Sequence, residues 1–310
     1  MRILVTGAGG FVGPHLMREL RAAGYDPIGV DRTGSSGVKI ADLSQHDEVE
    51  ALLEHQHPDA IVHLAGWSHV GRSWEMPAKV FQANLLCSIL LYEVFAKWAG
   101  SGARFLYISS SDVYGKGPPE RLPLTESTPT NPESPYAVSK LAAEQTLRLL
   151  RQRGGPDLMI ARPFNHIGPG QSASFACPAF ARQIVDIESG RREALRHGNL
   201  QSKRDFIDVR DAVRAYRLML ESGRDGDMFV VASGASHSME SIVKELFSIA
   251  GIEPKMKLDE HLLRPIDTPE LRGSAKHLHE RTKWSPKITL RESLTAVLEE
   301  ARGAFGNVPA

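Results

Sequence analysis

A glycine-rich loop near the N-terminus constrains the fold of this chain more than any other feature. Residues 6–13 read TGAGGFVG, and they lie between a short apolar run, Ile3–Thr6, and a segment with helical spacing, Leu16–Ala23. In such a strand–loop–helix unit the first glycine permits a tight turn, the second lets a pyrophosphate approach the backbone, and the third lets the helix pack closely on the sheet. The N–H groups at the helix start favour an anion. The motif therefore predicts a dinucleotide site that includes Gly7, Gly10, Phe11, Val12 and Gly13.

An acidic residue at the end of the next strand, Pro27–Asp31, supports this interpretation. Asp31 follows Gly13 by 18 residues, and a carboxylate at that place accepts hydrogen bonds from the adenosine ribose. Because a carboxylate repels a 2′-phosphate, Asp31 favours NADH. Arg32 pairs with such a phosphate and so favours NADPH, or it stacks on the adenine. The sequence favours NAD(H) slightly and leaves NADP(H) as the alternative.

Strands and helices alternate over the first 165 residues. Further strands are expected at Asp59–Ala65, Arg104–Ser109 and Leu158–Ala161, and long helices at Phe81–Trp98 and from Tyr136 to about residue 153. The alternation predicts an α/β fold with a doubly wound parallel sheet of the Rossmann type. After residue 165 the pattern weakens, but residues 227–232 again resemble a strand of the sheet. We predict a dinucleotide-binding domain of residues 1–165 plus about 205–232, interleaved with a smaller substrate domain of about 166–204 plus 233–310.

The composition argues against several other classes of protein. Lys and Arg together number 37, and Asp and Glu together also number 37. The chain therefore lacks the excess of positive charge that is typical of proteins that bind nucleic acids or anionic membranes. Cys87 and Cys177 are the only cysteines, which is typical of a reducing compartment. The first apolar run is too short for a signal peptide, and no stretch approaches the ~18 apolar residues of a membrane span. No metal-ligand spacing is present. We expect a cytoplasmic protein with no metal, nucleic-acid or membrane partner.

A second constellation combines a tyrosine, a lysine and a serine. Tyr136 and Lys140 are four residues apart in the segment YAVSK, so they share one helix face. A tyrosine with its ordinary pKa of about 10 is a poor acid–base catalyst at neutral pH, and a nearby ammonium lowers that pKa. Ser110 lies in the segment SSSDVYG directly after a predicted strand. A hydroxyl at this strand end is expected to face the tyrosine across a cofactor cleft.

The three motifs TGAGGFVG, SSSDVYG and YAVSK, in this order and spacing, resemble the extended short-chain dehydrogenase/reductases over essentially the whole chain. The resemblance implies that Tyr136 is the acid–base, that Lys140 binds the nicotinamide ribose and lowers the tyrosine pKa, and that Ser110 hydrogen-bonds the reacting oxygen. It also implies cofactor contacts from Asp42, Leu43, Leu64, Ala65, Gly66 and Asn84. This chain departs from the family's Asn-x-x-Gly-Thr, because Cys87 stands at the glycine. The family pairs two helices, here those of Phe81–Trp98 and Tyr136, across a two-fold axis, so a homodimer is expected.

A narrower resemblance is to the enzymes that modify GDP-mannose, especially the GDP-6-deoxy-D-mannose reductases. It is carried by the segments SHV (68–70), RPFNHIGPGQ (162–171), RDFIDVRD (204–211) and RPIDTP (264–269). The resemblance implies a small-molecule nucleotide-sugar substrate whose diphosphate is held by arginines, which suit it by charge and geometry. The implied substrate residues are Ser68, Ser111, Asp112, Asn165, Gln171, Asn199, Arg204 and Arg264.

The resemblance leaves a choice of reactions. The dehydratases of the family carry a glutamate two residues after the catalytic hydroxyl, where this chain has the shorter Asp112. Proton transfer depends on hydrogen-bond reach, so we expect a reductase that converts GDP-4-dehydro-6-deoxy-D-mannose to GDP-D-rhamnose with NAD(P)H. GDP-mannose 4,6-dehydratase, or another nucleotide-sugar dehydratase or epimerase, is the alternative. The presence of Ser110, Tyr136 and Lys140 argues against a third class, a non-catalytic dinucleotide sensor.

Overall fold

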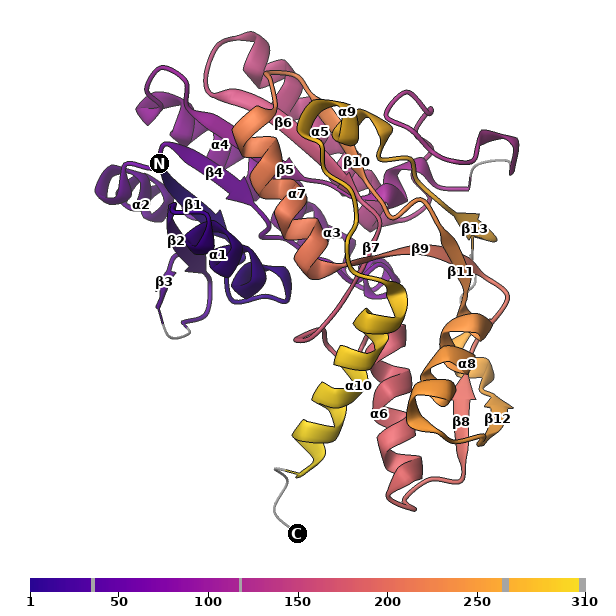
Figure 1. Cartoon of the computed structure of the whole chain (residues 1–310). Coiled ribbons are helices and arrows are strands. Elements are labelled where there is room, and N and C mark those ends of the chain that lie inside the picture. The colour runs from indigo at the N-terminus through magenta and orange to yellow at the C-terminus, as the bar shows by residue number, and fades with distance from the viewer. Residues whose placement is uncertain (35–36, 117–118, 264–267, 307–310) are drawn as a thin grey trace.

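A seven-stranded parallel sheet carries the site. The computed structural model describes residues 1–34, 37–116, 119–263 and 268–306 (Figure 1). The strands lie in the order β10-β6-β5-β4-β1-β2-β3, and each pairs in parallel with its neighbours. Their bounds are β1 Arg2–Thr6, β2 Asp26–Asp31, β3 Val38–Ile40, β4 Ala60–His63, β5 Arg104–Ile108, β6 Asp157–Pro163 and β10 Met228–Val231. The predicted doubly wound sheet is confirmed, including the return of β10, whereas the short β3 was not predicted.

Helices cover both faces of this sheet. The first face packs against α1 (Val12–Ala22), α7 (Val209–Ser222) and α9 (Lys276–Thr282), and the second against α2 (His46–Gln56), α4 (Cys87–Trp98) and α5 (Pro135–Gln152). In β1, Ile3 and Val5 belong to the first core, and Leu4 between them belongs to the second. A strand that is buried on both faces has no polar side, which is why its sequence is a continuous apolar run.

One helical run on the second face is unusually apolar. It comprises α3 (Pro77–Phe81), a π-helical turn (Gln82–Leu86) and α4. By length and composition this run would suffice to cross a membrane, contrary to the expectation that no stretch comes near such a span. Its residues Leu91, Tyr92 and Phe95 pack in the core between the sheet and its helices. This packing accounts for its apolar composition.

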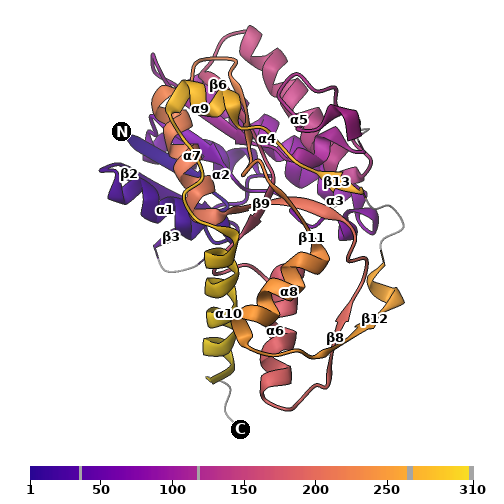
Figure 2. The same cartoon turned by 45° about the vertical axis from the view of Figure 1, so that its right-hand side comes forward.

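The smaller part of the molecule lies beyond the carboxyl ends of the strands (Figure 2). One small sheet joins β7 (Asn165–Ile167), β9 (Lys203–Asp208), β11 (Ser236–Ser238) and β13 (Glu270–Leu271), and another pairs β8 (Ala194–His197) with β12 (Lys255–Leu258). A third core forms between α6 (Ala176–Glu188), α8 (Met239–Ala250) and α10 (Leu290–Gly306). Short 3₁₀ helices occur at Gly71–Trp74, Ser111–Tyr114, Pro119–Arg121 and Glu260–Leu262.

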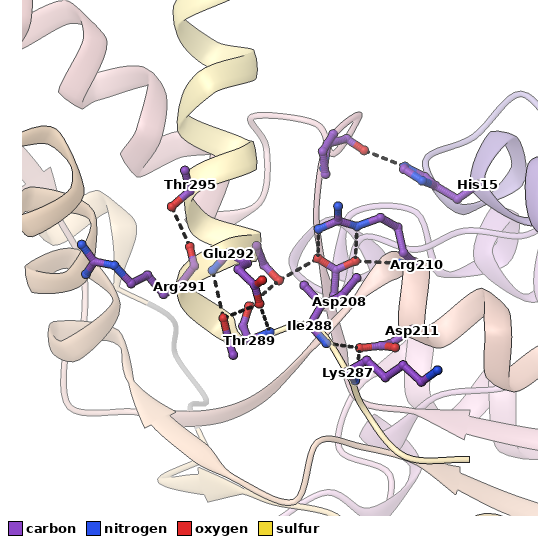
Figure 3. A network of polar contacts seen from close by, with 12 residues as sticks. His15, Asp208, Arg210, Asp211, Lys287, Ile288, Thr289, Arg291, Glu292 and Thr295 are labelled. Carbon is purple, nitrogen blue, oxygen red and sulfur yellow. Dashed lines mark hydrogen bonds and ion pairs between the residues drawn. The ribbon is translucent and has the colours of Figure 1, made fainter. Parts of the chain in front are cut away.

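The two parts interleave more than the predicted boundaries describe. Leu278 and Trp284 pack in the first core of the large sheet, although the prediction assigned residues 233–310 to the substrate domain. The chain then crosses to α10, and aspartates at the start of α7 hold the crossing (Figure 3). The Asp211 carboxylate accepts the backbone N–H groups of Lys287 and Ile288 at 2.7 and 2.8 Å. These bonds join α7, which packs on the large sheet, to the segment that leads into α10.

Candidate active site

The glycine loop has the backbone geometry of a pyrophosphate cradle. Gly7 has a φ of +72°, and a Cβ there would lie 2.8 Å from the backbone nitrogen of Ala65. A Cβ on Gly13 would lie 2.4 Å from the carbonyl oxygen of Ala8, so only glycine lets α1 approach the loop this closely. At Gly10 the nearest atom to such a Cβ is 3.3 Å away, and this glycine lines the cleft. The loop therefore fits a dinucleotide, with its backbone open where the phosphates would approach.

A single cleft of about 1270 Å³ runs from this loop along the carboxyl ends of the strands to the smaller part. Most residues predicted for the site line it: Gly7, Gly10, Phe11, Val12, Asp31, Arg32, Asp42, Leu43, Leu64, Ala65, Gly66, Ser68, Ser110, Ser111, Asp112, Tyr136, Lys140, Asn165, Gln171, Asn199 and Arg204. Gly13 is buried beneath the loop. Arg264 lies outside the residues that the structure describes.

At the adenosine end, carboxylates are fixed by backbone N–H groups. Asp31 accepts the N–H of Gly9 at 2.9 Å and that of Arg32 at 2.7 Å. Hydrogen bonds from the Ser44 backbone and hydroxyl hold the pKa of Asp42 below its usual value, and the charge of Arg32 lowers it further. The arginine charge therefore acts on Asp42, one of the residues predicted to contact the cofactor.

Asn84 supports the cleft from behind, although we predicted a cofactor contact for it. It is fully buried in the π-helical turn, where its Oδ1 accepts the Trp67 N–H at 2.7 Å and its Nδ2 donates to Ser139 Oγ at 2.9 Å. Ser88 Oγ donates to the Asn84 carbonyl at 2.7 Å and lies 2.9 Å from His63 Nε2. Burial lowers the pKa of His63 to about 3, so this imidazole is neutral at physiological pH. Through Asn84, this buried network connects the loop that contains Trp67 to Ser139 on α5.

The predicted catalytic hydroxyls come together. Ser110 follows β5 and caps the 3₁₀ helix Ser111–Tyr114, while Tyr136 lies in the first turn of α5, which Ser134 caps. The Ser110 hydroxyl lies close enough to the Tyr136 phenol to lower its pKa in part. The Ser110 Oγ–H also reaches Asp112 Oδ2 at 3.1 Å, and the Asp112 backbone N–H donates to Ser110 Oγ at 3.1 Å. The site thus holds a hydroxyl, a phenol and a carboxylate at one strand end.

The pKa of the phenol departs from the expectation. Burial raises the pKa of Tyr136, the charge of Asp112 raises it further, and the hydrogen bond with Ser110 lowers it in part. Lys140 was expected to lower this pKa, and it is not among the groups that do. Lys140 Nζ donates to the Ile108 carbonyl oxygen at 2.8 Å, and burial lowers the pKa of Lys140 itself to about 8. Tyr136 therefore keeps its proton at neutral pH in this structure.

At the substrate end, the predicted polar side chains also hold local backbone. Asn165 donates to the Asp205 carbonyl at 3.2 Å, Gln171 to that of His166 at 2.9 Å, and Arg204 to those of Lys203 and Thr268 at 2.8 and 2.6 Å, while Asn199 Oδ1 accepts the Gln201 N–H at 2.9 Å. All four of these side chains line the cleft. The structure brings them to the same end but leaves their roles toward a substrate as predictions.

Several residues that line the cleft were not predicted from the sequence. Trp74, Lys79 and Arg196 belong to the lining, and Trp74 is 58% exposed. The exposure of its large aromatic side chain marks Trp74 as a candidate binding residue, but exposure can be assessed only once the fold is known. His69 and Phe175 come from distant segments, with their ring centroids 5.7 Å apart. They form an aromatic wall that no sequence spacing indicates.

Comparisons with known proteins agree with this geometry. The profile of the family described as GDP-mannose 4,6 dehydratase matches residues 4–297. GDP-6-deoxy-D-mannose reductase of Pseudomonas aeruginosa is 38% identical over 96% of each chain, and GDP-mannose 4,6 dehydratase 1 of Arabidopsis thaliana is 28% identical over 96% of this chain and 88% of that protein. A structure of RMD from Pseudomonas aeruginosa complexed with NADPH superposes with a TM-score of 0.89, at 37% identity over 98% of this chain and 99% of the other. A Thermus thermophilus UDP-glucose 4-epimerase complex with NAD gives 0.87, at 28% identity over 98% and 100%.

Proposed function

Because the chain belongs to the GDP-mannose 4,6-dehydratase family, we propose that it reduces the 4-keto group of GDP-4-dehydro-6-deoxy-D-mannose to give GDP-D-rhamnose. The chain is an NAD(P)-dependent oxidoreductase, and it is related to the reductases and dehydratases that act on nucleotide sugars. The observation that carries the choice of reduction is the Ser110–Tyr136 pair, in which the phenol is held protonated beside a hydroxyl. The relative at 38% identity, which is named a reductase, also supports it.

Reduction of a ketone needs a proton donor at the oxygen that becomes the alcohol. A bound reduced nicotinamide supplies the hydride. Tyr136 is suited to donate the proton, because its raised pKa keeps the phenol protonated until charge develops on the substrate oxygen. Ser110 would hydrogen-bond the same oxygen, as the resemblance implies.

A second candidate, GDP-mannose 4,6-dehydratase activity, rests on Asp112. A dehydratase needs an additional acid–base group, and this carboxylate lines the cleft close enough to raise the pKa of Tyr136. Its hydrogen bonds with Ser110 hold it at the strand end, however, and its side chain is one methylene shorter than a glutamate. Shorter reach weakens the case for proton transfer to a carbon of the sugar.

The test is a comparison of two substrates with matched cofactors. GDP-4-dehydro-6-deoxy-D-mannose is incubated with NADH or NADPH, GDP-mannose is incubated with NAD⁺ or NADP⁺, and the products are analysed by mass spectrometry and NMR. We expect the keto sugar to consume reduced cofactor and yield GDP-D-rhamnose, while GDP-mannose stays unchanged. Loss of water from GDP-mannose would instead identify a dehydratase. Cofactor binding without turnover of either sugar, or of a panel of 4-keto nucleotide sugars, would indicate a sensor.

A homodimer through α4 and α5 is part of the proposal. These helices contact each other. Val138 and Leu149 on α5 are 38% and 62% exposed, Leu86 on the adjoining π-helical turn is 57% exposed, and Trp98 at the end of α4 is 41% exposed. Apolar side chains left exposed on adjacent helices are suited to pack against the same surface of a second copy. We expect a dimer mass in sedimentation experiments at micromolar concentration and a monomer for Leu149→Glu. A monomer mass for the native chain would contradict this proposal.

A further inference from the structure

A buried ion pair lies directly behind the catalytic residues. Glu144 on α5 is 0% exposed and Arg162 on β6 is 4% exposed. The pair is bidentate, with Arg162 Nε donating to Glu144 Oε1 at 3.0 Å and Arg162 Nη2 donating to Oε2 at 2.6 Å. Arg162 also donates to the hydroxyl of Tyr114 at 3.2 Å. Because desolvating two charges is costly, such a pair is weak evidence for stability, and its place in the fold suggests another role.

The carboxylate of the pair connects two parts of the site. Tyr136, Lys140 and Glu144 follow each other at intervals of four residues, so they lie along one face of α5. The Ser109 hydroxyl donates to Glu144 Oε1, and Ser109 immediately precedes the catalytic Ser110. Glu144 therefore holds the strand end that presents Ser110, and it lies one turn beyond Lys140 on the helix that presents Tyr136.

The surroundings of Lys140 give this carboxylate an electrostatic role. The Nζ atom lies 5.0 Å from the centre of the Tyr107 ring and donates to the carbonyl of Ile108. The titratable or charged groups that face it in the described part of the chain are His63 on β4, Tyr107 on β5, Tyr136 and Glu144 on α5, Asp112 beside Tyr136, and Arg162 on β6 beyond Glu144. His63 is neutral, and Asp112 acts on the phenol. Glu144 is the anion that stabilises the ammonium.

We propose that Glu144 is a positioning residue of the reduction site, which places an anion one turn from Lys140 on the same face of α5 and whose bond to Ser109 fixes the strand end that carries Ser110. Arg162 makes this possible, since its two hydrogen bonds orient a carboxylate that would otherwise be buried without a counter-charge. The proposal deepens the proposed function and rests on it, because Lys140 matters only where a dinucleotide is bound.

Two opposing effects set the pKa of Lys140. Burial lowers the pKa of Lys140 to about 8, and the charge of Glu144 opposes this shift. Without Glu144, burial would act unopposed and the pKa would fall further. A larger share of Lys140 would then be neutral at physiological pH and unable to bind the ribose hydroxyls as an ammonium.

The test removes the charge pair but keeps the fold. Glu144→Gln alone leaves Arg162 buried without a counter-charge, which is strongly destabilising. The double variant Glu144→Gln/Arg162→Met removes both charges, and its glutamine carbonyl still accepts the Ser109 hydroxyl. The control is Glu93→Gln, which removes an exposed carboxylate on α4. Circular dichroism and thermal melting establish that both variants are folded.

The readout is the protonation of Lys140 itself, in protein without cofactor or substrate. Trace labelling with acetic anhydride from pH 6 to 11, followed by peptide mass spectrometry, gives the pH midpoint of Lys140 reactivity. We expect the midpoint of the double variant to lie below that of the native chain and of Glu93→Gln, because the variant loses the anion nearer to Lys140, while loss of the Arg162 charge beyond it offsets part of the shift. An unchanged or higher midpoint in a folded double variant would overturn the proposal.

A second measurement separates this proposal from the proposed function. Fluorescence titration with NADH and NADPH gives the cofactor affinity as a function of pH. For the double variant we expect affinity to be lost at a lower pH than for the native chain, by the same shift as the Lys140 labelling midpoint. A native chain that binds neither cofactor would contradict the proposed function whatever the labelling shows. Equal cofactor pH profiles despite a lowered Lys140 midpoint would overturn the role of Glu144 toward the cofactor.

Discussion

The cofactor half and the substrate half of the cleft are built in different ways. In the cofactor half, most predicted groups follow a strand of one parallel sheet, as Gly7 follows β1, Asp31 ends β2 and Ser110 follows β5. The carboxyl ends of parallel strands meet at one edge, so groups at these ends converge without further information. Local sequence therefore suffices to specify this half.

The substrate half depends on contacts between distant segments. Arg204 lies on β9 and donates to the carbonyl of Thr268, which is 64 residues further along the chain. The aromatic wall of His69 and Phe175 joins a loop after β4 to the start of α6. One fold can host different functions when the residues of its site differ, and contacts between distant segments are where such differences are hardest to infer from local sequence.

The largest effect is expected where the cofactor half meets the substrate. Tyr136→Phe removes only the phenolic proton, so turnover of the keto sugar should fall by ~100- to 10,000-fold, the usual contribution of a general acid. Cofactor affinity should stay nearly unchanged, because the ring and its packing remain. Stopped-flow kinetics and fluorescence titration measure the two quantities. Near-native turnover would show that another group donates the proton.

The substrate half is tested by Arg204→Ala. If the guanidinium contacts the diphosphate, the dissociation constant for GDP should rise by roughly 10- to 150-fold, equivalent to about 1.5–3 kcal/mol for a charge-assisted hydrogen bond. NADH affinity should be unchanged, which is the control within the same protein. Calorimetry with GDP gives the result. Unchanged GDP affinity would confine Arg204 to its observed backbone contacts with Lys203 and Thr268.

The same comparison explains what the sequence could predict. The sheet, the glycine loop and the meeting of Ser110 with Tyr136 followed from strand ends and helix spacing, and the fold class is confirmed. Asn84 was predicted to contact the cofactor, because a motif identifies a residue but not the layer in which it lies. Only the π-helical turn and its bonds to Trp67 and Ser139 place it behind the cleft.

Electrostatics was the least predictable property. The spacing of Tyr136 and Lys140 suggested that the ammonium lowers the phenol pKa, but spacing does not reveal that Nζ points to Ile108. It also does not reveal how deeply both groups are buried, and burial is the largest cause of both shifts. Glu144 was missed for the same reason, since its partner Arg162 is 18 residues away on another element.

Lys140 predicts a pH dependence for the cofactor half. Because its pKa in the folded protein is lowered to about 8, the ammonium is present below that pH and lost above it. Cofactor affinity should therefore fall by up to tenfold per pH unit above about 8. The free energy of unfolding should instead rise with pH between about 8 and 10.4. Unfolded lysine keeps its proton to about 10.4 and so binds more protons than folded Lys140 in that window. Fluorescence titration and denaturant unfolding between pH 7 and 10 test both signs, and a flat affinity profile would contradict the assignment.

The smallest effect is expected for the choice between NADH and NADPH, because Asp31 and Arg32 in the cofactor half favour different cofactors. We propose a slight preference for NADH, because the Asp31 carboxylate already occupies the N–H of Gly9 and repels a 2′-phosphate. Arg32 opposes this, and the related structure from Pseudomonas aeruginosa contains NADPH. The test compares kcat/KM for the two reduced cofactors, with Arg18→Ala on the exposed side of α1 as the control. Asp31→Ala should shift the ratio toward NADPH, and Arg32→Ala should shift it toward NADH. A native preference for NADPH of about tenfold, or ~1.4 kcal/mol, would mean that the positive charge of Arg32 outweighs the carboxylate.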